Sequence, residues 1–112
     1  MKYNLNDRLF VTSGNEHGLS TTETVFHYFQ SGEVITGKYR GGEIIEGNFV
    51  GKFIAPSQIE LRFQCLTKSL DLLSGKSVGL ITELPNQRMT LTFDWEWLGE
   101  SKGGGTSSYV EL

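Results

Sequence analysis

The sequence has very little cysteine and proline. Among its 112 residues there are two prolines and one cysteine, Cys65. A single cysteine cannot close a disulfide within the chain. A zinc site would have to combine Cys65, His17 and His27 with carboxylates, at spacings that match no known zinc motif. We therefore expect no disulfide framework, no bound metal and no cofactor.

Excess positive charge and long apolar runs are also lacking. The 10 Lys and Arg residues are outnumbered by 13 Asp and Glu, which gives a formal net charge of −3. The basic residues are scattered singly, so they form no stripe for a phosphate backbone or an anionic membrane. No segment approaches the ~20 apolar residues of a membrane-spanning helix, and residues 1–7 contain no signal-peptide core. We expect a cytoplasmic protein without nucleic-acid or membrane partners, whose lone thiol stays reduced.

What the chain does have points to one globular domain covering residues 1–112. Charged residues make up 21% and hydrophobic residues 38%, which are ordinary globular values. The length suits a single hydrophobic core and excludes two separately cored domains. Glycine is the unusual residue, with 14 of 112 positions against a usual share of about 7%.

Alternation of apolar and polar residues recurs along the chain and predicts an all-β protein. The sharpest case is the segment 89–98, whose inward phase reads Met, Leu, Phe, Trp, Trp. The expected strands cover about residues 8–12, 22–30, 34–40, 43–54, 58–67, 75–83, 89–98 and 106–112. A helical turn is plausible only at 68–72.

The connections between these strands are short, and several carry turn residues. Gly41-Gly42, for example, is typical of a two-residue hairpin turn that needs positive φ. Consecutive hairpins argue against a Greek-key sandwich. Eight strands can close into an antiparallel up-and-down barrel, whose interior is filled or holds one small ligand, and closure removes exposed sheet edges. We predict such a barrel.

Six of the glycines form three pairs with a Gly-x-x-x-Gly spacing, namely Gly37 with Gly41, Gly47 with Gly51 and Gly75 with Gly79. Positions i and i+4 of a strand share one face, so each pair removes two side chains from that face. Glycines of this kind mark sharp bends of a small barrel. The alternative is that they open space for a ligand.

The segment 32–39, Gly-Glu-Val-Ile-Thr-Gly-Lys-Tyr, resembles the Thr-Gly-x-Tyr strand of avidins and streptavidin. A weaker similarity lies in 97–101, Trp-Leu-Gly-Glu-Ser. The resemblance implies a barrel of the calycin type, which also includes the lipocalins. The biotin-binding pattern near the avidin N-terminus has no visible counterpart here, so the fold is implied and biotin is not.

Over nearly its whole length the chain also resembles a group of small uncharacterised bacterial proteins. The shared features are Tyr39-x-Gly41-Gly42, Gly47-x-x-x-Gly51, the segment 60–63, Trp95-x-Trp97, Gly99 and Ser107. Some members are labelled N-acetylglutamate synthase. However, acetyltransferases hold coenzyme A with a glycine-containing loop that opens a helix, and this chain has no such loop. We therefore favour a non-enzymatic role and name no catalytic residue.

Three sets of polar residues have alternative interpretations. Asp94 and Glu96 are spaced like paired glycosidase carboxylates, but their phase predicts a solvated exterior. Cys65 and His27 would form a thiolate–base pair only if their strands adjoin, and a cysteine on an apolar face is usually a buried hydrophobe. The segment 102–108 has the composition of a phosphate loop but lacks its order and its helix, which favours a mobile hairpin loop.

Aromatic residues on the inward phase are the candidate binding site, because they combine apolar area with polar tips. Arg62 and Gln64 would add polar anchors only if they faced inward. We predict binding of a small apolar or amphipathic molecule. The alternatives are a homodimeric interaction module that uses outward Val25, Phe29 and Ile45, and, less favoured, an enzyme. The candidate ligand-binding residues are Tyr28, Tyr39, Phe63, Phe93, Trp95, Trp97 and Tyr109.

Overall fold

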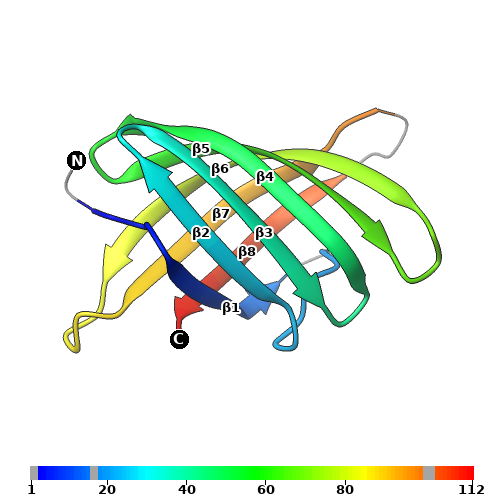
Figure 1. Ribbon diagram of the computed structural model, residues 1–112, viewed down its shortest axis with the longest axis horizontal. Coiled ribbons are helices and arrows are strands. Elements are labelled where there is room, and N and C mark those ends of the chain that lie inside the picture. Colours follow the sequence, from blue (N-terminus) through cyan, green and yellow to red (C-terminus); the bar gives the residue numbers. More distant parts are fainter. Residues whose placement is uncertain (1–2, 16–17, 100–102) are drawn as a thin grey trace.

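The protein is described by a computed structural model that covers residues 3–15, 18–99 and 103–112. Its eight antiparallel strands form a closed barrel in which each strand pairs with the next and the last pairs with the first (Figure 1). This confirms the predicted up-and-down barrel. The strands are β1 (Arg8–Asn15), β2 (Val25–Ser31), β3 (Val34–Gly41), β4 (Ile44–Ala55), β5 (Gln58–Thr67), β6 (Leu72–Glu83), β7 (Met89–Trp97) and β8 (Gly104–Glu111).

Four strand boundaries differ from the prediction by two residues or more. β1 continues to Asn15 instead of ending at about residue 12, because Gly14 and Asn15 pair with β8. The segment 68–72 forms no helical turn: Leu70 N donates to Thr67 O at 2.8 Å in a tight turn, and β6 already begins at Leu72. That early start follows from the pairing of Leu72 with Leu66 in the β5–β6 ladder. β2 begins three residues later than expected because Thr24 N donates to Thr21 O at 2.9 Å in a preceding turn. β8 begins at Gly104 instead of residue 106.

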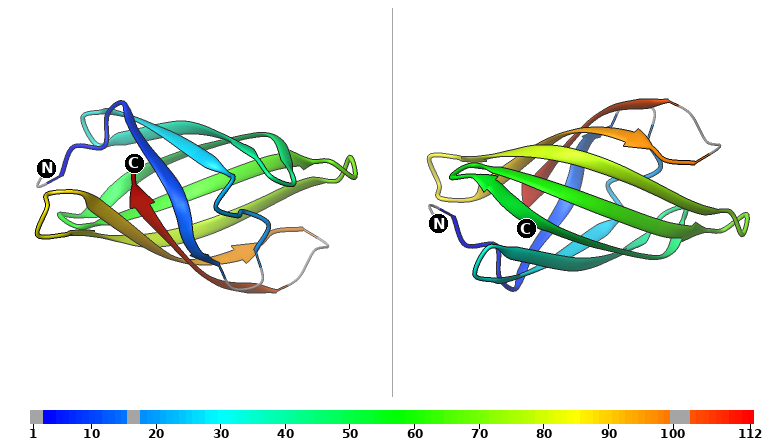
Figure 2. Two further views of the ribbon diagram at one scale, coloured as in Figure 1. Left: turned by 90° about the horizontal axis from the view of Figure 1, so that it is seen from below. Right: turned by 90° about the horizontal axis from the view of Figure 1, so that it is seen from above.

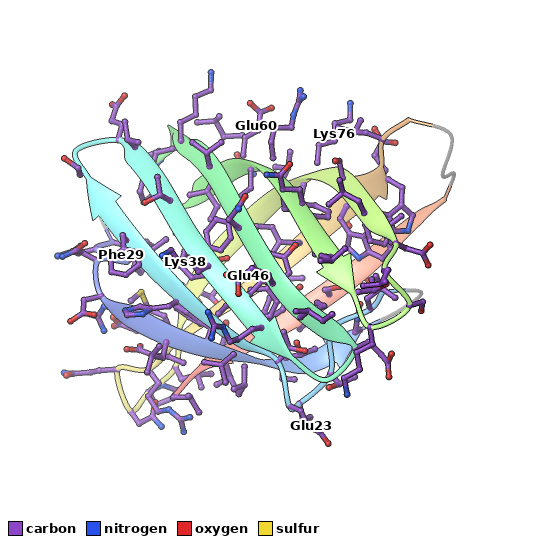
Figure 3. The ribbon with its side chains drawn as sticks, turned by 45° about the vertical axis from the view of Figure 1, so that its right-hand side comes forward. Glu23, Phe29, Lys38, Glu46, Glu60 and Lys76 are labelled. Atoms are coloured by element: carbon purple, nitrogen blue, oxygen red, sulfur yellow. The ribbon has the colours of Figure 1, made fainter. Side chains whose placement is uncertain are left out.

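Apolar alternation determines which side of each strand faces the interior. Along β7, Phe93 and Trp95 are buried, whereas Asp94 and Glu96, which alternate with them, are exposed. The same rule sends polar side chains outward along β3 to β6 (Figure 3). Among the outward-pointing residues of these strands, Figure 3 labels Lys38, Glu46, Glu60 and Lys76.

The two ends of the barrel differ. We call the end that holds both described termini and the β2–β3, β4–β5 and β6–β7 turns the base, and the opposite end the mouth (Figure 2). At the base, the segment before β1 inserts Leu5, whose side chain is completely buried and whose N–H donates to Gln30 Oε1 at 2.8 Å. Leu5 packs within the core. The largest fully buried side chains are Phe10, Leu5, Ile35, Ile59, Ile81, Leu91 and Thr24.

The strand glycines on the inner face lie beneath aromatic rings of the neighbouring strand. A Cβ added at Gly37 would come within 2.0 Å of the Phe49 ring, and one at Gly75 within 2.2 Å of the Phe63 ring. These residues are direct partners in the strand ladders, as are Gly47 with Tyr39 and Gly79 with Phe93. The space that these glycines leave is therefore occupied by rings that lie against the barrel wall.

The remaining two paired glycines have other surroundings. Gly51 lies beside the Glu60 carbonyl, where a Cβ would approach to 2.0 Å. Gly41 adopts a φ of 119° and is followed by Gly42 with a φ of 62°, as expected for the β3–β4 hairpin. Positive φ at two successive positions favours glycine, as predicted, but the two residues between the strands are Gly42 and Glu43, because Gly41 still pairs with Ile44.

Candidate functional site

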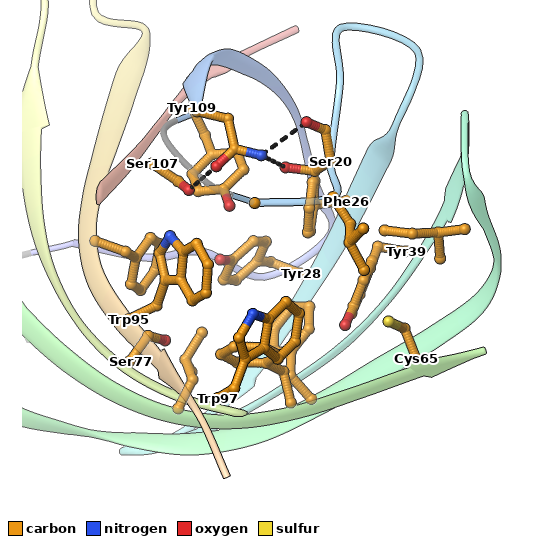
Figure 4. A pocket seen from close by; sticks show the side chains of 18 residues that line it. Ser20, Phe26, Tyr28, Tyr39, Cys65, Ser77, Trp95, Trp97, Ser107 and Tyr109 are labelled. Carbon is orange, nitrogen blue, oxygen red and sulfur yellow. Dashed lines mark hydrogen bonds between the residues drawn. The ribbon is translucent and has the colours of Figure 1, made fainter. Parts of the chain in front are cut away.

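The mouth half of the barrel contains a cavity of about 80 Å³ (Figure 4). Residues from all eight strands and from the β1–β2 connection line it. All seven of the residues named from the sequence are among them: Tyr28, Tyr39, Phe63, Phe93, Trp95, Trp97 and Tyr109. The structure thus brings the set together in one place, while their contact with a ligand stays a prediction.

Ring-to-ring contacts fix the aromatic walls. Phe26 stacks on Tyr39 with centroids 4.8 Å apart, and its ring also meets Tyr109 edge-on at 4.8 Å. On the β7 side, Trp95 and Trp97 meet edge-on at 5.1 Å. Offset and edge-on arrangements are the favoured geometries of aromatic pairs. These contacts hold the rings against one another and so keep the lining ordered.

A polar cluster lies at the mouth, centred on Asn15 at the end of β1. Its Nδ2 donates to Ser20 O at 2.8 Å and to Ser20 Oγ at 3.2 Å, and its Oδ1 accepts from Ser107 Oγ at 2.5 Å (Figure 4). Tyr109 also hydrogen-bonds with Ser107 and Ser20. The cluster joins β1, β8 and the segment before β2, so it anchors that segment beside the cavity.

The described residues that line the cavity carry no charge. They are Asn, Ser, Gly, Cys, aliphatic and aromatic residues. Burial raises the pKa of Tyr28, an effect to which Tyr109 adds, and burial also raises the pKa of Tyr109 itself. The pKa of Tyr39 is raised chiefly by burial and further by Cys65. These phenols therefore stay protonated around neutral pH and act as neutral hydrogen-bonding groups.

One donor in the lining has no partner. Trp95 Nε1 is buried and makes no hydrogen bond, although the Trp95 side chain lines the cavity. Tyr39, in contrast, donates from its hydroxyl to Gln64 O at 3.1 Å. A buried polar group without a partner is uncommon in folded proteins and calls for an explanation.

The sequence profile described as avidin-like protein matches residues 3–112. The chain belongs to the avidin-like family. No curated protein and no solved structure matches it. Barrels of this family typically bind small ligands and often oligomerise, and the closed eight-stranded architecture agrees with membership. The family assignment also confirms the resemblance noted in the sequence.

Other candidate residues of this avidin-like barrel lie outside the cavity. Arg62 and Gln64 are exposed on the outer face of β5 and so add no polar anchor to the lining. Asp94 and Glu96 are exposed as well, and Glu96 pairs with Lys76 at 3.0 Å. These placements agree with the solvated exterior predicted from their phase.

The proposed thiolate–base pair does not form. His27 points outward and its Nε2 lies 2.7 Å from Asp7 Oδ1, whereas Cys65 is buried and hydrogen-bonds with Tyr39. Of the other candidates, His17 and Lys102 lie outside the described residues, and the hairpin loop predicted for 102–108 is wrong from Gly104 onward, where β8 begins. Within the described ranges, no cluster could hold a metal ion and no helix is long and apolar enough to span a membrane.

The candidate ligand-binding residues named from the sequence did not include the polar lining residues Asn15, Ser20, Ser77 and Ser107. Ser77 lies midway between Gly75 and Gly79, so it shares their inward phase. Ser107 precedes Tyr109 by two positions and therefore has the phase of that candidate. For Ser77 and Ser107, the signal in the sequence was a small polar residue at a position where the alternation predicts an inward-facing side chain. Asn15 and Ser20 offered none, because no alternation extends into their segment.

Proposed function

We propose that this avidin-like barrel binds one small molecule in the mouth half of its interior. The observation that carries the proposal is the contrast between the two halves of one barrel. The base is filled by completely buried aliphatic and aromatic side chains, whereas the mouth half encloses a lined cavity. A concave, mostly apolar site with a few convergent polar groups is the usual form of a small-molecule site.

The size of the cavity limits what can be enclosed. An apolar protein cavity of about 150 Å³ holds a benzene molecule. The present cavity of about 80 Å³ therefore encloses only a smaller group. A larger ligand would place one end inside and leave the remainder at the mouth, beside Leu19, Ser20 and Trp97, which also line the site.

The polar cluster suits this arrangement. Asn15, Ser107 and Tyr109 are linked to one another at the mouth, where a ligand has to pass. Amide and hydroxyl groups can exchange hydrogen bonds with an incoming polar group without the cost of burying a charge. The aromatic walls then supply the apolar contact area.

Native mass spectrometry of the purified protein tests the proposal, since retained ligand mass and oligomeric state come from one spectrum. Titration with small neutral compounds, followed by tryptophan fluorescence, supplies affinities. We expect Ser77→Leu to abolish binding, because Ser77 lines the cavity and leucine would fill part of it. Ser74→Leu, on the exposed side of the same strand, is the matched control and should bind normally. Equal binding by both variants would place the ligand elsewhere, and no binding by the wild type would refute the function.

A second candidate role is self-association through the outer surface. Val25, Phe29 and Ile45 are outward-facing apolar residues with exposed fractions of 36%, 36% and 45%. Exposed apolar residues of this kind are common at protein–protein contacts when they are contiguous. Phe29→Glu should convert a dimer to a monomer in sedimentation analysis while Ser77-dependent binding persists. A wild-type protein that is monomeric at all usable concentrations would exclude this role.

A further inference from the structure

Trp95 presents the cavity with a hydrogen-bond donor that the described part of the chain leaves unused. Its Nε1 has no partner among residues 3–15, 18–99 and 103–112, and the residue is only 9% exposed. The ring is held on one side by Trp97, with the centroids 5.1 Å apart (Figure 4). The indole N–H can only donate, so a partner for it must be an acceptor.

The neighbouring residues do not satisfy this donor, although several carry acceptor atoms. Ser107 Oγ donates to Asn15, and the Tyr39 hydroxyl donates to the Gln64 carbonyl. Both oxygens could still accept, but neither forms a hydrogen bond with Trp95 Nε1. In Figure 4 the Tyr28 hydroxyl points toward the side of the cavity that holds Trp95. A ligand group that entered between these side chains would meet the indole edge from inside the barrel.

The residues around the cavity also disfavour a charged ligand. Among the described side chains that line the cavity, none is ionised around neutral pH, since they are all of neutral residue types and burial raises the pKa of each tyrosine. An ion moved from water into such a site would lose its hydration without gaining a counter-charge. A neutral acceptor loses far less.

We propose that the enclosed part of the ligand is uncharged and presents one acceptor, of the carbonyl type, to Trp95 Nε1–H. This inference rests on the proposed small-molecule binding and specifies its chemistry. The acceptor atom of the ligand accepts a hydrogen bond from Trp95 Nε1–H. The aromatic walls contact the apolar remainder of the enclosed group.

A pair of isosteric probes tests the acceptor. Acetone and 2-methylpropene, both smaller than benzene, differ by a carbonyl oxygen in place of a methylene group. We expect the ketone to bind about tenfold more tightly, because it pairs a donor that otherwise stays buried without a partner. In ¹⁵N–¹H spectra of the wild type, the ketone should move the Trp95 indole signal downfield, and the alkene should not. With two tryptophans in the chain, Trp97→Phe identifies the signal.

Two variants separate the donor from the ring. Trp95→Phe keeps an aromatic ring and removes the N–H, so the preference for the ketone should fall to about one. Trp97→Phe should weaken both probes together and leave their ratio unchanged. A second pair, propionamide and propionate, tests charge, and we expect binding of the amide only.

The outcomes distinguish the inference from the function on which it rests. If no neutral probe binds, both fail. If the ketone and the alkene bind equally, if Trp95→Phe keeps the ketone preference, or if propionate binds as well as propionamide, the inference is overturned and small-molecule binding stands. Should Trp95→Phe not fold, the indole shift in the wild type decides the question alone.

Discussion

Gly79 on β6 and Phe93 on β7 are direct partners in the strand ladder, and the Phe93 ring covers the Gly79 backbone so closely that an added Cβ would lie 2.3 Å from it. Glycine weakens a strand because it has no side chain to pack. Here the cross-strand ring supplies that packing, an arrangement known from curved sheets. The glycine lets the ring lie along the wall instead of projecting across the barrel.

Substitution of Gly79 should therefore be costly. We expect Gly79→Ala to lower the free energy of unfolding by about 1–3 kcal/mol, because the Phe93 ring has to leave its place. Denaturant unfolding measures the change. Gly14→Ala is the matched control, since a Cβ there meets only Ser108 Cβ at 3.9 Å. Equal losses in the two variants would contradict the role assigned to the ring.

Leu5 should contribute to stability as a plug of the base. Its side chain is completely buried, although it precedes the first strand. We expect Leu5→Ala to cost about 2–5 kcal/mol, the usual range for a large-to-small change in a core. Leu72→Ala, at a residue that is 75% exposed, should change the midpoint of thermal unfolding very little. A small effect at Leu5 would show that the segment before β1 is not part of the core.

Glu111 should make stability depend on pH. Burial opposes ionisation of its carboxylate, but hydrogen bonds from Met89 N at 3.0 Å and Arg8 Nη1 at 2.7 Å outweigh burial and lower its pKa. A depressed pKa in the folded state stabilises the protein above the unfolded value of about 4.3, and this contribution is lost as pH falls through the folded value.

Glu111→Gln tests this dependence. At neutral pH the variant should unfold about 1–3 kcal/mol more easily, since hydrogen bonds to a charged group are lost. The difference from the wild type should shrink as the pH is lowered below about 4. Glu23→Gln, at an exposed carboxylate in a turn, is the control. A difference that stayed constant between acid and neutral pH would rule out the carboxylate as its source.

Cys65 should ionise at an unusually high pH. Burial raises the pKa of its thiol, and the hydrogen bond with Tyr39 offsets this only in part. Because alkylation requires the thiolate, the pH–rate profile of the native protein with iodoacetamide should have its midpoint above the usual value of about 8.5. The denatured protein provides the reference, and a native midpoint at or below that reference would refute the shift.

The barrel and its aromatic lining were predictable from sequence because both follow from alternation. The phase of β7 alone places Phe93, Trp95 and Trp97 inside. The turn at 68–72 was misjudged because a short polar stretch between two strands resembles a helical turn until the pairing of Leu72 with Leu66 is known. Local propensity cannot reveal that pairing.

The polar part of the site was less accessible to prediction. Asn15 contacts Ser107, which is 92 residues away in the chain, and this contact exists only because β8 closes onto β1. Whether Trp95 Nε1–H finds an acceptor likewise depends on which hydrogen bonds the neighbouring side chains form. Such relationships belong to the closed barrel and leave no pattern in any one strand.

The two ends of the barrel separate two requirements that usually compete within a small domain, namely a stable core and a binding site that tolerates substitution. Side chains at the base, such as Phe10 and Leu91, secure the fold without touching the cavity. Those at the mouth can then be exchanged at moderate risk to folding. Substitutions confined to the mouth can therefore change which ligand the barrel binds, while the base continues to stabilise the fold.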